Sequence, residues 1–202
     1  PADPSTAAFF AGAVSLLPQS ELIIKNLLTN PTRFEFFNTI KSMGVELDIL
    51  SENFEGGECV SDIFIKNKRL RSISIEKSKV PSLIDEIPIL AVIATQAEGK
   101  TIIRGAEELR VKESDRIAAM AEFIIELGGT IKVFEDGFEI NGDQDLKEGS
   151  VNTHDDHRIA MTAVVANICI NRGIVANNID CISDSYPSFF DDLSLIGADY
   201  GL

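Results

Sequence analysis

The chain has 202 residues, a formal net charge of −14 and a pI near 4.5. This acidity argues against nucleic acid as a partner, because nucleic-acid binding needs clustered Lys and Arg, and it also disfavours anionic membrane surfaces. Small anionic substrates stay possible, because a few arginines can create a local positive field in an acidic protein.

The sequence contains neither a membrane-span pattern nor a secretory signal. No stretch approaches the roughly 18 to 20 apolar residues of a membrane span, and no basic segment precedes an apolar one at the start. The three cysteines, Cys59, Cys169 and Cys181, are odd in number and lack metal-type spacing. This usage favours reduced thiols and a cytoplasmic location. Because the first residue is Pro, we expect the chain to be trimmed or to be part of a longer protein.

The predicted elements recur three times along the chain. Each unit begins with a nearly all-apolar, hence buried, helix, followed by a strand and then by an amphipathic helix that ends at glycine. In the first unit these elements cover 5–17, 21–26 and 31–43. In the second unit they cover 87–97, 100–105 and 112–127. In the third unit they cover 159–170, 173–178 and 187–196. The terminating glycines are Gly44, Gly128 with Gly129, and Gly197.

Two further strands follow the amphipathic helix in the first two units. They are expected over 45–50 and 60–67, and over 130–135 and 137–141. Segments 51–57 and 143–149 resemble polar surface loops. The third unit ends before its strands could form. We therefore predict one mixed α/β domain over 1–202, with buried parallel helices surrounded by small mixed sheets. The last unit is incomplete, and we expect its missing strands to come from a segment preceding Pro1.

Charged residues gather where the predicted helices begin. The second buried helix follows Asp85 and Glu86, and the third follows Asp155 and Asp156 with His157 and Arg158. The amphipathic helices begin near the set Arg33, Arg110, Lys112, Glu113, Asp115 and Arg116. Helix N-termini favour anions, so arginines there suit an external anion held between N–H groups and guanidinium. We therefore predict a small-anion site lined by Lys112, Arg116 and Arg158, with Asp85 and Glu113 as proton-exchanging carboxylates.

Structural explanations compete with this one. Asp85 and Asp156 could be simple helix caps, and Arg116 could pair with Glu113 three residues earlier. His157 could be satisfied by a backbone carbonyl, and Arg33 could serve the substrate or a nearby loop. Arg158 is hardest to explain structurally, because a cation gains nothing from a positive helix end.

Other chemistries have less support. The run His154, Asp155, Asp156, His157 contains metal-type ligands, but it has no further His to join it and an adjacent Arg would repel a cation. We therefore expect no metal. No nucleophile elbow, P-loop or dinucleotide-binding glycine pattern occurs, so we expect no cofactor.

Several motifs resemble the 5-enolpyruvylshikimate-3-phosphate synthase family. They run in order as DPSTAAFF (3–10), NPTR (30–33), DEIPILAVIATQAEGKTIIRGAEELRVKESDR (85–116), DDHRIAM (155–161) and SYPSFFDDL (185–193). The resemblance implies βαβαββ-type units in one of two domains, with the active site between the domains. It also implies transfer of the enolpyruvyl group of phosphoenolpyruvate to the 5-hydroxyl of shikimate 3-phosphate, with release of phosphate.

The resemblance also implies roles for individual residues. Asp85 corresponds to an acid/base aspartate that contacts shikimate 3-phosphate, and Lys112 to a lysine that binds that substrate. Glu113 corresponds to the carboxylate of proton transfer at the methylene carbon. Arg116 and Arg158 correspond to arginines that bind phosphoenolpyruvate, and His157 lies at the edge of the site. The implied partners are these two substrates and the missing N-terminal domain, within an enzyme that is monomeric at full length.

The resemblance has one departure and leaves two rival functions. Some members have a Lys before the aromatic–Pro step near the C-terminus, where this chain has Asp184 before Tyr186 and Pro187. We assign Asp184 no role. One rival is a related enolpyruvyl transferase acting on a UDP-sugar, and the other is a non-catalytic anion-binding domain.

Overall fold

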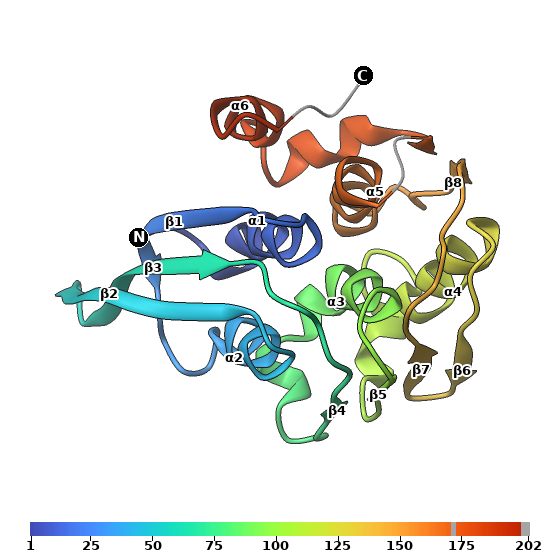
Figure 1. Ribbon diagram of the computed structural model, residues 1–202, viewed down its shortest axis with the longest axis horizontal. Coiled ribbons are helices and arrows are strands. Elements are labelled where there is room, and N and C mark those ends of the chain that lie inside the picture. Colours follow the sequence, from blue (N-terminus) through green and yellow to red (C-terminus); the bar gives the residue numbers. More distant parts are fainter. Residues whose placement is uncertain (171–172, 199–202) are drawn as a thin grey trace.

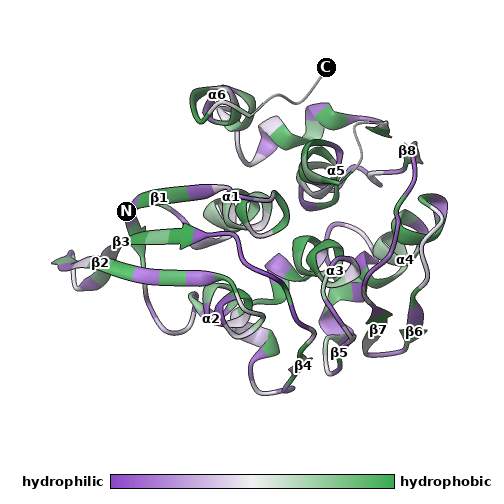
Figure 2. Cartoon of the chain, in the orientation of Figure 1, coloured by the Kyte–Doolittle hydropathy of each residue, from purple (hydrophilic) through white to green (hydrophobic). Residues whose placement is uncertain are grey.

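Three helices occupy the centre of the computed structural model, which describes residues 1–170 and 173–198 (Figure 1). They are α1 (Pro4–Leu16), α3 (Ile87–Thr95) and α5 (His157–Cys169). Each contacts the other two. Every residue of α3 is buried, and Figure 2 shows this helix mostly in the hydrophobic colour. The prediction of three all-apolar helices at one centre is therefore confirmed.

Each central helix connects two strands that run parallel to each other. In the second unit α3 connects β4 (Ser74–Ile75) to β5 (Lys100–Ile103). In the third unit α5 connects β8 (Gly149–Val151) to β9 (Ile174–Ala176). In the first unit a single parallel bridge from Ala2 to Leu27 takes the place of the first strand. The sequence analysis missed β4 and β8, because strands of two or three residues are too short to show alternation.

The remaining elements complete small sheets and an outer layer of helices. The first unit continues through β1 (Glu21–Leu28), α2 (Glu35–Ser42), β2 (Glu46–Glu55) and β3 (Glu58–Lys66). The second continues through α4 (Arg116–Glu126), β6 (Lys132–Phe134) and β7 (Gly137–Asn141). The third contributes α6 (Phe189–Leu195). The sheet orders are β1-β3-β2, β4-β5-β7-β6 and β8-β9.

The third sheet is the smallest among the described residues. It contains two strands, whereas the equivalent sheet of the second unit contains four. This difference matches the expectation of an incomplete last unit. The origin of any further strands stays a prediction.

Segment 51–57 is not a loop, contrary to the sequence analysis. Strand β2 extends to Glu55, which pairs with Glu58 across a two-residue turn at Gly56 and Gly57. Both glycines have positive φ, +61° and +90°, as the tight hairpin turn that matches strand twist requires. The prediction was wrong because β2 is an edge strand with mostly exposed residues, so its sequence is polar without clear alternation. Segment 143–149 is irregular as expected, except that Gly149 begins β8.

The amphipathic helices begin later than predicted, although they end where expected. Asn30 and Arg33 lie in a turn closed by an Arg33 N–H to Asn30 O hydrogen bond of 2.9 Å, and α2 starts after it. Before α4 the chain forms the short 3-10 helix η3 (Glu107–Val111), and the Asp115 side chain then caps α4. The glycines after the three helices, Gly44, Gly128 and Gly197, all have positive φ, as their C-terminal position predicts.

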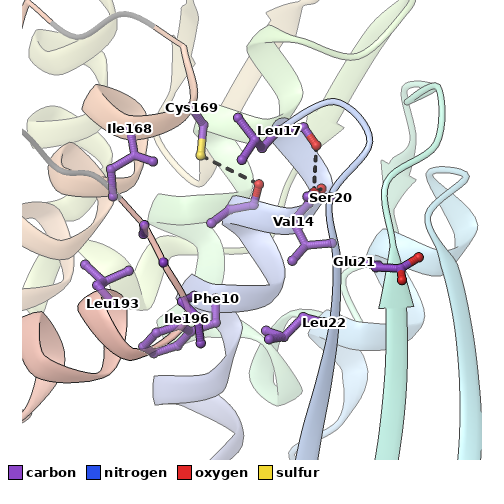
Figure 3. A pocket seen from close by; sticks show the side chains of 13 residues that line it. Phe10, Val14, Leu17, Ser20, Glu21, Leu22, Ile168, Cys169, Leu193 and Ile196 are labelled. Carbon is purple, nitrogen blue, oxygen red and sulfur yellow. Dashed lines mark hydrogen bonds between the residues drawn. The ribbon is translucent and has the colours of Figure 1, made fainter.

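The packing around α1 is tight on one side and open on the other. A Cβ at Gly12 would lie 2.6 Å from Cγ1 of Ile89, so glycine permits the close approach of α1 and α3. The next residue, Ala13, lines an apolar cavity of about 260 Å³ between α1, β1, α5 and α6. Figure 3 shows Phe10, Ile168 and Leu193 around this cavity. Within 1–170 and 173–198, no helix is long and apolar enough to cross a membrane.

We expect Gly12→Leu and Ala13→Leu to differ strongly in stability. Leucine at position 12 would overlap Ile89 and force the central helices apart, at a cost of about 3 kcal/mol in the free energy of unfolding. Leucine at position 13 can extend into the cavity and should change that free energy by less than about 1 kcal/mol. Urea unfolding of both variants would measure the difference. Equal costs would show that α1 and α3 are not in close contact at Gly12.

Candidate active site

The predicted site residues lie where α3, α4 and α5 begin. Asp85 belongs to the 3-10 helix η2 (Ile84–Glu86), directly before α3. Arg116 is the first residue of α4, and Lys112 and Glu113 precede it. His157 and Arg158 are the first residues of α5. The structure thus brings these six side chains together from the second and third units, as the helix-start pattern predicts.

Arg116 is the centre of this cluster. Its side chain is only 1% exposed, yet it is a cation. Its guanidinium donates to three carboxylates: Nε to Asp156 Oδ2 at 2.8 Å, Nη1 to Asp85 Oδ1 at 3.0 Å and Nη2 to Glu113 Oε2 at 2.6 Å. These charges outweigh the opposing effect of burial and raise the pKa of Arg116. The ion pair between Arg116 and Glu113 that the sequence suggested is therefore present, but it is one of three ion pairs that Arg116 makes.

Asp156 has a larger role than the cap that the sequence suggested. It does cap α5, since its Oδ1 accepts the backbone N–H of Arg158 at 2.9 Å. Its Oδ2 also accepts from the Ser114 hydroxyl at 2.9 Å and from Arg116. Burial would raise the pKa of this fully buried carboxylate, but the hydrogen bond and charge of Arg116 reverse that effect, so the pKa is lowered. The group therefore stays ionised and connects α4 to α5.

Asp85 faces three cations at once. Its carboxylate lies 3.0 Å from Arg116 Nη1, 3.7 Å from Lys112 Nζ and 3.9 Å from Arg158 Nη2. Burial acts to raise its pKa, but the charges of Arg158, Lys112 and Arg116 outweigh it and lower the pKa. The carboxylate is thus an ionised group that can accept a proton.

Arg158 is held against the start of the neighbouring central helix. Its Nη1 donates to the backbone oxygen of Asp85 at 3.3 Å and lies 4.0 Å from Glu86 Oε1. These acidic neighbours explain how a cation can be accommodated at the first turn of α5. The preceding residue, His157, has a lowered pKa because burial and the nearby Arg158 charge disfavour its protonated form.

Lys112 and Glu113 lie on the open side of the cluster. The Glu113 side chain is 50% exposed although it pairs with buried Arg116. Lys112 Nζ lies 3.4 Å from Glu108 Oε1 in addition to its contact with Asp85. Solvent or a ligand can therefore reach the cluster from the side of these two residues.

Other candidates lie outside this cluster. Arg33 Nη2 donates to Asp3 Oδ1 at 3.1 Å and to Ser5 Oγ at 2.9 Å, so it binds the start of α1. Asp184 is exposed at the end of the 3-10 helix η4 (Ile179–Asp184). His154 contacts Glu122, with Nε2 3.1 Å from Oε2. Among the residues that the structure describes, no group of three or more His, Cys, Asp or Glu side chains could hold a metal ion.

We expect Asp156→Asn to destabilise the fold by about 3 kcal/mol, because it removes the charge of the one fully buried carboxylate among the three that compensate Arg116. The pKa of Asp156 is below its ordinary 3.8 in the folded protein, so its stabilisation is present above 3.8 and is lost as pH falls through the folded value. The stability difference between wild type and Asp156→Asn should therefore narrow below 3.8. Urea unfolding over a series of pH values measures it.

Asp155→Asn is the matched control, because Asp155 is adjacent but exposed. It should change the free energy of unfolding by less than about 0.5 kcal/mol. Equal effects of the two substitutions would refute the special role of the Asp156–Arg116 pair.

Known proteins resemble this chain along nearly all of its length. The family profile described as EPSP synthase (3-phosphoshikimate 1-carboxyvinyltransferase) matches residues 1–193. A 3-phosphoshikimate 1-carboxyvinyltransferase of a Sulfurihydrogenibium species is 46% identical over 97% of this chain and 46% of its own length. The protein of the same name from Persephonella marina is 47% identical, again over 97% of this chain and 46% of its own length.

Solved structures agree. The EPSP synthase of Acinetobacter baumannii superimposes with a TM-score of 0.92 and 33% identity, covering 98% of this chain and 46% of that one. The enolpyruvyl transferase NikO from Streptomyces tendae shares the fold, with a TM-score of 0.68 and 18% identity over 98% of this chain and 43% of that one. The chain thus spans about half the length of the relatives it matches. On the match over residues 1–193 and these identities, the chain belongs to the EPSP synthase family.

Proposed function

We propose that this chain supplies one half of an active site that transfers the enolpyruvyl group of phosphoenolpyruvate to the 5-hydroxyl of shikimate 3-phosphate, releasing phosphate. The observation that carries the proposal is the position of Asp85, within 4 Å of Lys112, Arg116 and Arg158. Two phosphorylated substrates need several cations held close together, and the reaction between them needs a carboxylate at the same place. Membership of the EPSP synthase family supports the same reaction.

Arg116 is 1% exposed in the presence of its three carboxylate partners, so binding of phosphoenolpyruvate to it calls for the displacement of one of them. Asp156 is fully buried, whereas Glu113 is half exposed and bonded to the outer nitrogen of the guanidinium. We infer that an anionic oxygen of phosphoenolpyruvate takes the place of Glu113 on Arg116, with Arg158 as a second cation. The displaced Glu113 is then free to act on the substrate.

The two exposed carboxylates divide the proton transfers. Asp85 accepts the proton of the attacking 5-hydroxyl as its oxygen bonds to the central carbon of phosphoenolpyruvate. Glu113 in its protonated form gives a proton to the methylene carbon. In the second step the methyl group returns a proton to Glu113 while the carbon–oxygen bond to phosphate breaks and restores the enol double bond. Asp85 gives its proton to the departing phosphate, so both carboxyl groups return to their starting states. Lys112 binds shikimate 3-phosphate, and His157 lies at the edge of the site. The reaction so written requires neither a metal nor an organic cofactor.

The rest of the site belongs to the part of the protein that lies outside this chain. Homologues are about twice as long, and we propose that their other domain closes over the Asp85 side of the cluster. We further propose that the full-length enzyme is a cytoplasmic monomer. The three free cysteines of this chain favour such a reducing compartment.

The full-length protein should release phosphate when it is given both substrates and should release none when either is omitted. Phosphate release and detection of the enolpyruvyl product would measure this. The 202-residue chain alone should be inactive, because half of the substrate contacts are absent. Failure of the full-length protein to form product would refute the proposal.

In the full-length protein, Arg158→Ala should lower kcat/KM by about 100-fold or more, because a cation that stabilises the reacting anion is lost. Its far-ultraviolet circular dichroism should match that of wild type. The control is Arg69→Ala, since Arg69 is exposed and pairs with Glu98 away from the cluster. Near-normal turnover by Arg158→Ala would exclude Arg158 from the mechanism.

A further inference from the structure

Glu86 is a buried carboxylate next to the proposed site that has no part in the reaction described above. It is 5% exposed and is the last residue before α3. Its side chain makes no capping hydrogen bond to α3, although it occupies the N-cap position. A buried carboxylate is costly without partners, so the reason for its position must lie in other elements.

The partners of Glu86 come from the first and third units. The Ser5 hydroxyl, at the start of α1, is a neighbour that acts to lower the pKa of the Glu86 carboxylate. The Ser5 hydroxyl oxygen accepts a hydrogen bond from Arg33 Nη2 at 2.9 Å, so Arg33 helps to fix the position of Ser5. On the other side Arg158 Nη1 lies 4.0 Å from Glu86 Oε1. Glu86 thus joins the starts of all three central helices.

Asp85 and Glu86, the two acidic neighbours of Arg158, have different roles in the proposed reaction. Asp85 exchanges a proton with substrate in the proposed function, so its attraction for Arg158 changes during turnover. Glu86 is 5% exposed and lies 4.0 Å from Arg158, whereas the Asp85 side chain is 37% exposed. Its charge can therefore hold Arg158 in one place while Asp85 changes its state.

Building on the proposed function, we propose that Glu86 is a positioning residue that fixes Arg158 for binding phosphoenolpyruvate, with Ser5 and Arg33 fixing Glu86 in turn. Arg33 thereby serves the site without touching substrate, which joins the two roles that the sequence left open for it. Burial raises the pKa of Glu86 against the lowering effects of Ser5, Arg158 and Arg33, and Asp85 raises it further. The charge of Glu86 thus depends on these partners.

The test uses Glu86→Gln in the full-length protein, because glutamine preserves the size of the side chain and removes its charge. We expect KM for phosphoenolpyruvate to rise about tenfold, as befits the loss of one charge contact, while KM for shikimate 3-phosphate changes less than about twofold. Glu86→Gln should raise KM for phosphoenolpyruvate by a smaller factor in the Arg158→Lys variant than in wild type, because both substitutions act on the same contact. If Glu86 had only a structural role, Glu86→Gln would change both KM values by the same factor. Its effect would then also be the same in the Arg158→Lys variant as in wild type.

Glu98→Gln is the matched control, because Glu98 also pairs with an arginine but lies past the other end of α3. It should leave both KM values unchanged. A tenfold rise in this control would overturn the inference, because the effect would then not depend on Arg158.

A second measurement does not depend on catalysis. The side-chain Nε–H signal of Arg158, identified by its loss in Arg158→Lys, should shift in the nitrogen–proton spectrum of Glu86→Gln and not in that of Glu98→Gln. An unmoved signal overturns the inference, as does a KM for phosphoenolpyruvate that does not rise. If the wild-type protein forms no product, the proposed function fails, and the Arg158 signal alone decides the inference.

Discussion

Arg116 and Asp156 form an ion pair that water barely reaches, since their side chains are 1% and 0% exposed. A charge in such a place is tolerated only while its partner and hydrogen bonds are complete. The pair therefore requires the first residue of α4 to meet the residue that caps α5. Because Arg116 also bonds Asp85 before α3, the same requirement orients the start of that helix.

The threefold repeat explains why charged residues from several helices meet near this ion pair. Central helices that each connect two parallel strands start on the same side of the core, so their partly positive N-termini collect there. This chain is strongly acidic, yet Lys112, Arg116 and Arg158 surround Asp85 at this one place. Carboxylates hold these cations in position without any ligand, which would lower the cost of arranging them in the proposed reaction.

The elements that could be predicted are those with a clear local pattern in the sequence. The central helices could be predicted because they are apolar on every side, and the helix ends because glycine accepts positive φ. Strands β4 and β8 could not, since pairing partners far along the chain define them. The first part of edge strand β2 was predicted as a strand over 45–50, whereas its second part, within 51–57, was not, because most of its side chains face water.

The site was predictable in its residue types and less so in its connections. Charged residues at helix starts indicated Asp85, Arg116 and Arg158. The sequence did not indicate that Asp156 would be shared between capping α5 and pairing with Arg116, because these residues are 40 positions apart. The link from Arg33 through Ser5 to Glu86 was missed for the same reason. The motifs contain the side chains that lie together in the structure, and only tertiary packing shows which of them meet.

The buried arginine also has a consequence for how the protein is made. A ribosome delivers the first two units, through β7 at Asn141, before it delivers Asp156. During that interval Arg116 has Asp85 and Glu113 as partners but lacks Asp156, the fully buried member of its three carboxylate partners. We therefore expect the start of α4 to stay hydrated until the third unit is made. Arrival of the third unit provides the missing carboxylate together with α5. We therefore expect closure of the core around the Arg116–Asp156 pair to require the last central helix, α5.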